Sequence, residues 1–266
     1  MDLQLLVLCS LTFVIHFIGA LAYAARIAGV RTKRIAVSFA LFNILVLVSR
    51  ASNSFQGPFL SKRIELNLLS GGAPLIWDFQ LLLLSATLAA MLGALAVPTA
   101  QRLFTKAVEH FHENRSVPKL LLHVFAKGGL SYLRLAATAP SLDHLSGMKR
   151  EGAVPVHVIA LNIAAQAFLT VGVFASLYAG YINPELRVTA VSLSSVINGV
   201  ATILLFVFID PHLSVMTDDV VTGRTSEASF RRAVVWLAGS RVVGTLLAQF
   251  ALVPAATAIA FVARII

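Results

Sequence analysis

The chain has 266 residues, of which 58% are hydrophobic and only 12% are charged, and its mean hydropathy is +0.85. This composition excludes an ordinary water-soluble domain, and apolar runs of about twenty residues indicate helices that cross a bilayer. The formal net charge of +9 fits cytoplasmic loops beside anionic lipids, so no nucleic-acid partner is expected.

The predicted fold class is all-α, a polytopic integral membrane protein with about six transmembrane helices in a single domain, residues 1–266. The apolar runs lack the alternation, over about ten residues, of an outer-membrane barrel. We expect helices at about residues 3–23, 35–55, 74–97, 154–181, 186–209 and 233–263.

The first two helices are joined by a basic link. Asp2 is the only charge before the first helix, whereas Arg26, Arg31, Lys33 and Arg34 follow it. Positive charge is enriched in cytoplasmic loops, so we expect a retained helix, rather than a cleaved signal peptide, with its N-terminus outside. Most other Lys and Arg residues fall in alternate connections, which favours an N-out/C-out topology.

The second helix carries a charge deep inside its apolar run. Its polar side consists of Asn43, Arg50, Ser54 and Gly57. We expect an external connection at residues 57–73, which contain Pro58, and a third helix that starts at Pro74 and stops at Pro98.

A charged region, residues 99–152, separates the third and fourth helices. We expect amphipathic helices at the cytoplasmic interface here. The apolar runs in residues 119–139 are too short to span, so we place this segment at the interface too, with a re-entrant hairpin as the alternative.

The last two helices carry further polar groups. A small, polar stripe on the fifth helix contains Ser192, Ser195, Gly199 and Thr202. We expect Asp210-Pro211 to end this helix and a charged loop to follow. The sixth helix carries Arg241, with a kink at Pro254.

Arg50 and Arg241 are the strongest functional signals. An arginine at the centre of a bilayer costs about 2.5–3.5 kcal/mol even on the lenient insertion scale, so such residues face a bundle interior or cavity. The planar guanidinium matches phosphate oxygens, which predicts an anionic substrate. The structural alternative is a carboxylate partner, helix-end carbonyls, or snorkelling to the surface.

The surroundings of these arginines repeat along the chain. Ser38-Phe39 precedes Ser49-Arg50 at the same spacing at which Ser229-Phe230 precedes Ser240-Arg241. We predict two parallel, repeat-related arms that present both arginines to one anion.

Four acidic residues are candidates for gating or for proton or cation coupling, namely Asp210, Asp218, Asp219 and Glu227. One hypothesis is that they pair with Arg31 and Arg34 in one conformation, and the alternative is a solvated loop with a helix cap near Ser226. His16 is a candidate for contact with the headgroup or for proton coupling. The alternative is a hydrogen bond from His16 to a neighbouring helix. Metal-ligand spacing is absent, and no cofactor is expected.

Signatures of common enzymes are missing. The sequence has no P-loop and no Gly-x-Ser-x-Gly elbow, and Cys9 has no evident base. A polyprenyl-pyrophosphate phosphatase is the enzymatic alternative, because residues 238–241, Ala-Gly-Ser-Arg, faintly resemble the phosphate loop of that family. The paired glutamates of that family are absent from the third helix, which offers only Asp78.

Several segments carry a resemblance to a known family. They are Ile-Ala-Gly-Val-Arg-Thr at 27–32, Ser-Phe-Ala-Leu-Phe-Asn at 38–43, Ser-Arg at 49–50, Asn-Ser-Phe-Gln at 53–56, Asp-Pro at 210–211, Thr-Asp-Asp-Val at 217–220 and Gly-Thr-Leu-Leu-Ala-Gln at 244–249. The chain closely resembles the Amj family of bacterial membrane proteins, described as an alternate to MurJ in lipid II flipping.

The resemblance implies a lipid II flippase of the bacterial cytoplasmic membrane rather than an enzyme. Such a protein moves the undecaprenyl-pyrophosphate-linked peptidoglycan precursor from the cytoplasmic to the outer leaflet, and we expect alternating access. Six helices enclose little space for so large a headgroup, so we also expect a homodimer. The other expected partners are the surrounding membrane lipids. A non-catalytic partner of the wall-synthesis machinery is the remaining alternative.

The resemblance supplies no residue-level motif, so we assign the substrate-binding residues from their type and position. For the pyrophosphate and headgroup these are Arg50, Arg241, Arg31, Arg34, Asn43, Ser49, Ser240, Gln249 and His16.

Overall fold

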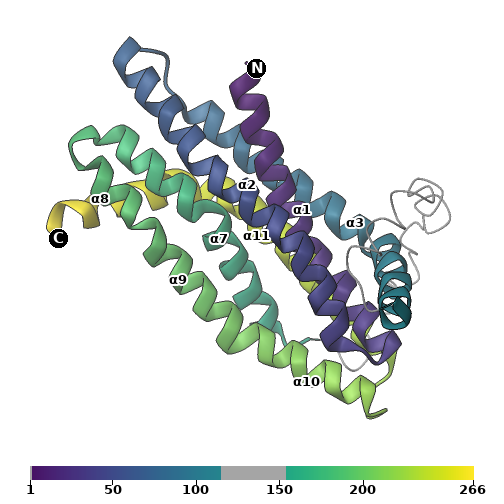
Figure 1. Ribbon diagram of the computed structural model, residues 1–266. Helices are drawn as coiled ribbons and strands as arrows, with labels where there is room; N and C mark the ends of the chain where they lie inside the picture. Colours follow the sequence, from purple (N-terminus) through teal and green to yellow (C-terminus); the bar gives the residue numbers. More distant parts are fainter. Residues whose placement is uncertain (1, 115–153) are drawn as a thin grey trace.

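The computed structural model describes residues 2–114 and 154–266, and every element in these residues is helical (Figure 1). This confirms the all-α class, and six stretches are long and apolar enough to cross a membrane. The segment 119–139 lies outside the described residues. The long helices are α1 (Leu3–Thr32), α2 (Ile35–Ser70), α3 (Ile76–Asn114), α7 (Val156–Ile182) and α11 (Glu227–Ile265).

α1 has a defined start and stop. The Asp2 side chain caps its first turn by accepting a hydrogen bond from the Leu5 amide at 2.8 Å. Lys33 ends the helix with a left-handed φ of 55°, and its amide donates to the carbonyls of Gly29 and Val30. The chain therefore reverses within two residues and enters α2.

α2 is longer than the sequence predicts, because it continues through Pro58 to Ser70 across the expected connection at 57–73. Proline removes one backbone hydrogen bond from a helix. Because the helix continues, Gln56, Leu60 and Ile64 are all buried on one side of it. Only 1% of the surface of Leu60 and of Ile64 is exposed. The packing of this side offsets the missing bond.

α3 likewise runs through Pro98, where we expected its end. Val97, Ala100, Phe104 and Val108 are buried and share one helical side, so the apolar stripe continues past the proline. The first part of the region 99–152 therefore extends α3.

The fifth span is segmented. It consists of η2 (Pro184–Leu186), α8 (Arg187–Ser192), α9 (Ser194–Leu204), the π-helix η3 (Leu205–Ile209) and α10 (Asp210–Val221). Asp210-Pro211 does not end the span as expected, because proline in the first turn of α10 lacks only an amide that would have no helical partner. Gly223, with a φ of 79°, then turns the chain toward α11, which Ser226 caps.

The helices form one bundle in which α1 packs on α2 and α3, while α11 packs on α7 and α3 and α7 packs on α9. Both chain termini lie away from the end of the bundle that holds the α1–α2 and α10–α11 links (Figure 1). We call the end with these links the link end and the opposite one the terminus end. The basic links predict that the link end is cytoplasmic, and this orientation stays a prediction.

The apolar core has two main parts. The link-end core gathers around Tyr23, Phe104, Phe230 and Leu237. The terminus-end core gathers around Leu8, Phe79, Phe174 and Leu252. These clusters occupy successive stretches of the same helices, so the middle of the bundle separates them.

Candidate functional site

A polar layer lies between the two apolar cores. Along α1, α2, α3, α7 and α11, buried polar side chains occupy the turns between the residues of one core and those of the other. These polar residues are Thr12, Ser52, Gln56, Thr87, Gln166, Thr170, Ser240 and Thr245. Asn162 lies one turn before Gln166, at the edge of the link-end core. Burying a polar group in the middle of a membrane-spanning bundle is costly unless the group is hydrogen-bonded. We therefore take this layer as the candidate site.

Arg241 on α11 is the charge in this layer. Its guanidinium lies against Gly19 of α1, where an added Cβ would overlap Nη2 and lie 3.1 Å from Cζ. The Nε atom is buried and has no hydrogen-bond partner, and no carboxylate of the described residues pairs with Arg241. The carboxylate partner of the structural alternative is therefore not seen in this part of the chain.

Two side chains of α1 flank the guanidinium. His16 and Tyr23 both lie close enough to Arg241 to interact with its charge. His16 is half-buried, and its Nδ1 atom is buried without a hydrogen-bond partner. The layer therefore has two buried polar atoms without hydrogen-bond partners, His16 Nδ1 on α1 and the Nε atom of the Arg241 guanidinium on α11.

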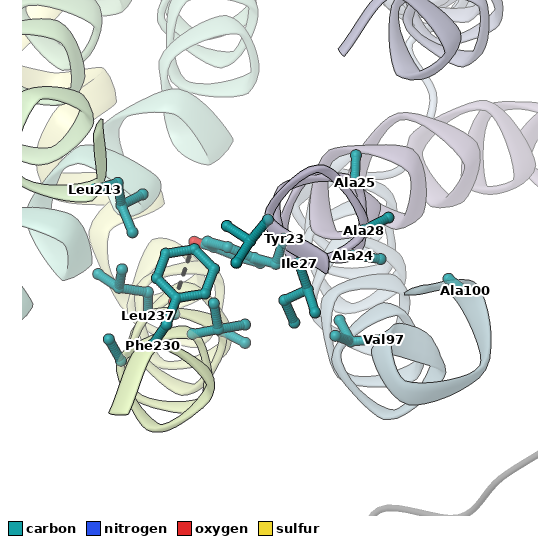
Figure 2. Close-up of a cluster of buried hydrophobic side chains, with 14 of the residues drawn as sticks. Tyr23, Ala24, Ala25, Ile27, Ala28, Val97, Ala100, Leu213, Phe230 and Leu237 are labelled. Carbon is teal, nitrogen blue, oxygen red and sulfur yellow. Dashed lines mark hydrogen bonds between the residues drawn. The ribbon is translucent and has the colours of Figure 1, made fainter. Parts of the chain in front are cut away.

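A hydrogen-bond network fixes the helix turn that precedes Arg241. The Leu237 carbonyl accepts from Tyr23 Oη at 3.2 Å, from Asn162 Nδ2 at 3.1 Å and from Ser240 Oγ at 2.9 Å. Figure 2 shows Tyr23 reaching from α1 to Leu237, among apolar side chains of the link-end core. Asn162 also donates to Ser240 Oγ at 2.7 Å, and Gln166 Nε2 donates to Asn162 Oδ1 at 3.4 Å.

The sequence predicts Arg241, Ser240 and His16 as site residues, but it does not single out Tyr23 and Asn162 as partners in this network. A signal was present for Tyr23, because His16, Gly19 and Tyr23 recur on one side of a helix. Asn162 shares one side of its predicted helix with Gln166 and Thr170, and a neutral polar stripe of this kind also serves ordinary helix packing.

Arg50 lies in different surroundings. It is exposed on α2, as is Asn43, while Ser49 is half-buried. The described residues contain no ion pair to Arg50, and Ser54 Oγ donates to its backbone carbonyl at 3.0 Å. Arg50 and Arg241 therefore differ in burial, and their sharing of one anion stays a prediction.

Gln249 contacts α3. Its Nε2 donates to Thr87 Oγ1 at 3.3 Å, and its backbone carbonyl accepts from Gln80 Nε2 at 3.1 Å. These bonds join α11 to α3 two turns beyond Arg241, toward the terminus end.

Ion pairs gather at the link end. Arg26 of α1 pairs with Asp210 of α10 at 2.8 Å, and its guanidinium lies 5.1 Å from the ring centre of Phe39. Arg31 of α1 pairs with Glu227 of α11 at 2.6 Å. Arg31 is a partner that the hypothesis names for Glu227, and Ser226 also caps α11 as the alternative states, so a gating role for Glu227 stays a prediction.

The other charged candidates at this end are less constrained. Glu227 also pairs with Arg231 at 3.0 Å, and Asp219 pairs with Arg224 at 3.2 Å within the turn between α10 and α11. Asp218 is exposed, and Arg34 is half-buried at the start of α2.

A second set of ion pairs, which the sequence analysis missed, lies at the terminus end. Arg63 of α2 pairs with Asp78 of α3 at 2.6 Å and with Asp2 at 2.7 Å. The amide of Leu5 and the guanidinium of Arg63 together hold the pKa of the Asp2 carboxyl below its usual value of 3.8. The partners are far apart in sequence, so no local pattern indicates them.

No group of three or more His, Cys, Asp or Glu side chains in residues 2–114 and 154–266 is placed to hold a metal ion. The chain matches the family described as "Amj: Alternate to MurJ" over residues 11–263. It belongs to the Amj family. It is 37% identical over 266 residues to the lipid II flippase Amj of Bacillus subtilis, a match that covers 98% of this chain and 97% of the relative.

No solved structure matches the chain. Membership in this bacterial family, together with six helices able to span a bilayer, makes this Amj protein a multi-pass protein of the cytoplasmic membrane. The resemblance seen in the short segments of the sequence is thereby confirmed over most of the chain.

Proposed function

We propose that this Amj protein is a lipid II flippase, which moves the undecaprenyl-pyrophosphate-linked precursor from the cytoplasmic to the outer leaflet without changing it chemically. The observation that carries the proposal is Arg241, a guanidinium without a carboxylate partner in the polar layer between two apolar cores. The 37% identity to a lipid II flippase supports the choice of substrate.

The pyrophosphate is the part of this lipid that is hardest to move. Two phosphate groups lose most of their hydration in the bilayer centre, and a fixed guanidinium replaces part of it through charge-assisted hydrogen bonds. In our proposal Arg241 binds one phosphate, and Arg50, on the exposed side of α2, supplies a second contact. The polyprenyl tail stays in the lipid throughout.

Alternating access requires that each end of the bundle open in turn. The Arg26–Asp210 and Arg31–Glu227 pairs join α1 to α10 and α11 at the link end, and the Arg63 pairs join α2 to α1 and α3 at the terminus end. We propose that one set breaks while the other holds. An incoming pyrophosphate competes with Glu227 for Arg31, and Arg34 adds positive charge at entry.

The test is reconstitution of the purified protein in vesicles with labelled lipid II, following leaflet exposure and phosphate release together. We expect exposure in the opposite leaflet without phosphate release. Phosphate release without flipping would establish the phosphatase alternative, and neither activity would favour a non-catalytic partner of the wall machinery.

Substitutions separate the role of Arg241 from a general effect of charge. Arg241→Gln is expected to slow flipping about tenfold or more, since a hydrogen bond between charged groups is lost. Arg264→Gln is the matched control, because Arg264 lies on the same helix and donates to Asn183 at its exposed end. Equal flipping by the two variants would make Arg241 a structural residue.

We also propose a homodimer, because six helices form a small wall around a disaccharide-peptide headgroup. Chemical crosslinking in native membranes is expected to give a dimer band. Only monomers at every crosslinker length would contradict this.

A further inference from the structure

A pocket of about 250 Å³ lies at the terminus end, between α2 and the α7–α8 corner. Its apolar wall is formed by Ile64, Leu177, Val188 and Val191, and its polar groups are Ser61, Glu65, Arg187 and Ser192. None of these polar residues belongs to the polar layer around Arg241. The pocket is therefore a second candidate site.

The charges of the pocket are available to a ligand. Arg187 Nη1 and Glu65 Oε1 are 3.8 Å apart, which is longer than a hydrogen bond, and 37% and 53% of these side chains are exposed. A guanidinium and a carboxylate on opposite walls match a ligand with a carboxylate and with N–H donors. A peptide has both, whereas a neutral sugar has no charge.

The pocket also continues the side of α2 that carries Arg50. Ser61 follows Arg50 by three helical turns, so the two side chains lie on nearly the same side of α2, about 16 Å apart along its axis. Gly57, between them, has open space where a side chain would be. No neighbouring side chain therefore covers this side of α2 at position 57, between Arg50 and the pocket.

We infer that this pocket binds the peptide of the lipid II headgroup, with Arg187 binding a peptide carboxylate and Glu65 accepting from peptide N–H groups. The inference rests on the proposed function, since it takes lipid II as the substrate and places its pyrophosphate at the middle of the bundle. The sugar that carries the pyrophosphate also carries the peptide, so this sugar and the extended peptide together span the distance between Arg50 and the pocket. The pocket thereby selects for a complete precursor.

The test compares two lipids in the same vesicle assay, lipid II and an otherwise identical lipid whose disaccharide carries no peptide. Arg187→Gln is expected to slow flipping of lipid II about tenfold, through loss of a charge-assisted hydrogen bond, and to leave flipping of the peptide-free lipid unchanged. Unchanged flipping of that lipid also shows that the variant is folded. Arg241→Gln, in contrast, is expected to slow both lipids.

Two further variants separate recognition from structure. The exchanged pair, Glu65→Arg with Arg187→Glu, keeps an ion pair but inverts its direction, so lipid II flipping should stay slow. Val191→Phe fills the apolar wall without altering charge and should also slow lipid II alone. It replaces Arg187→Gln as the probe if that variant does not fold.

The inference is overturned if the exchanged pair restores lipid II flipping, or if the folded variants affect both lipids equally or neither. A wild-type protein that flips neither lipid would instead overturn the proposed function, and the inference with it.

Discussion

Arg241 of α11 packs directly against Gly19 of α1 in the polar layer. The guanidinium occupies the space where any larger residue at position 19 would place its Cβ. Glycine in a helix interior lowers helix propensity, so its presence here is explained by this contact. The orientation of Arg241 therefore depends on α1 as much as on α11.

We predict that Gly19→Ala slows flipping roughly tenfold while the protein still folds, because the methyl group displaces the guanidinium by about an ångström and binding geometry is sensitive at that scale. The measurement is the lipid II vesicle assay. Gly239→Ala is the matched control, since Gly239 is exposed on α11 and has open space at its Cβ. Unaltered flipping by Gly19→Ala would show that Arg241 need not hold this position.

A pH dependence is expected from Asp2. Its folded-state pKa is depressed, so its contribution to stability is present above the ordinary value of 3.8 and is lost as the pH falls through the lower folded value. Asp2→Asn keeps an acceptor for the Leu5 amide but loses the charge that pairs with Arg63. We predict slightly lower thermal stability of this variant at pH 7 and equal stability at low pH. A stability difference that does not depend on pH would contradict this origin.

The sequence identifies some site residues and cannot identify others. Arg50 and Arg241 stand out because a charge inside an apolar run is costly whatever its surroundings. Tyr23 and Asn162 do not stand out, because their role depends on the Leu237 carbonyl of another helix. Glu65 on α2 and Arg187 on α8 are far apart in the sequence, so no local pattern predicts that their side chains lie close together.

At the scale of the helix, the prolines explain where sequence and structure differ. The sequence predicts a helix end at about residue 55, before Pro58, and another at Pro98, yet α2 and α3 continue through both prolines. Local propensity favours a stop at proline, but an apolar stripe that persists beyond it gains more from burial than one hydrogen bond is worth. The start of α1 at Leu3, which Asp2 caps, agrees with the prediction, whereas α11 begins at Glu227 rather than at about residue 233, because Ser226 caps it there.

The contact between α7 and α11 also depends on one glycine. A Cβ on Gly244 would lie 2.6 Å from the Ile163 carbonyl oxygen and 3.2 Å from the Ala167 amide, which are backbone atoms that cannot rotate away. We predict that Gly244→Ala destabilises the protein by about 1–3 kcal/mol through overpacking. Thermal unfolding in detergent measures this. Gly199→Ala, at an open position on α9, should leave stability nearly unchanged, and equal stability of both variants would contradict close packing here.

At the scale of the whole molecule, the two apolar cores and the two sets of ion pairs close the bundle on both sides of the polar layer. In this arrangement Arg241 is separated from each end by packed side chains. A charged headgroup that enters from either end of the bundle must displace one of these cores. Entry from the link end separates α1 from α10 and α11, which the Arg26–Asp210 and Arg31–Glu227 pairs join.

The last prediction tests that motion at the link end, where Arg31 Nε and Glu227 Oε1 are 2.6 Å apart. In a Cys9→Ala background, which removes the single native cysteine, Arg31→Cys with Glu227→Cys can be bridged by a short bifunctional thiol reagent. We expect bridging to stop flipping and cleavage of the bridge to restore it, because α1 and α11 must separate in each cycle. Each single-cysteine variant treated with the same reagent is the control.

A second pair extends the test to the terminus end, where Asp2→Cys with Arg63→Cys should give the same reversible block. Alternating access requires both ends to open in turn, so each bridge alone should suffice to stop flipping. Full flipping with the link-end bridge in place would show that the headgroup does not enter between α1 and α11. Full flipping with only the terminus-end bridge in place would show that the headgroup does not leave between α1 and α2. The link-end pairs would then be the only one of the two sets of ion pairs that acts as a gate.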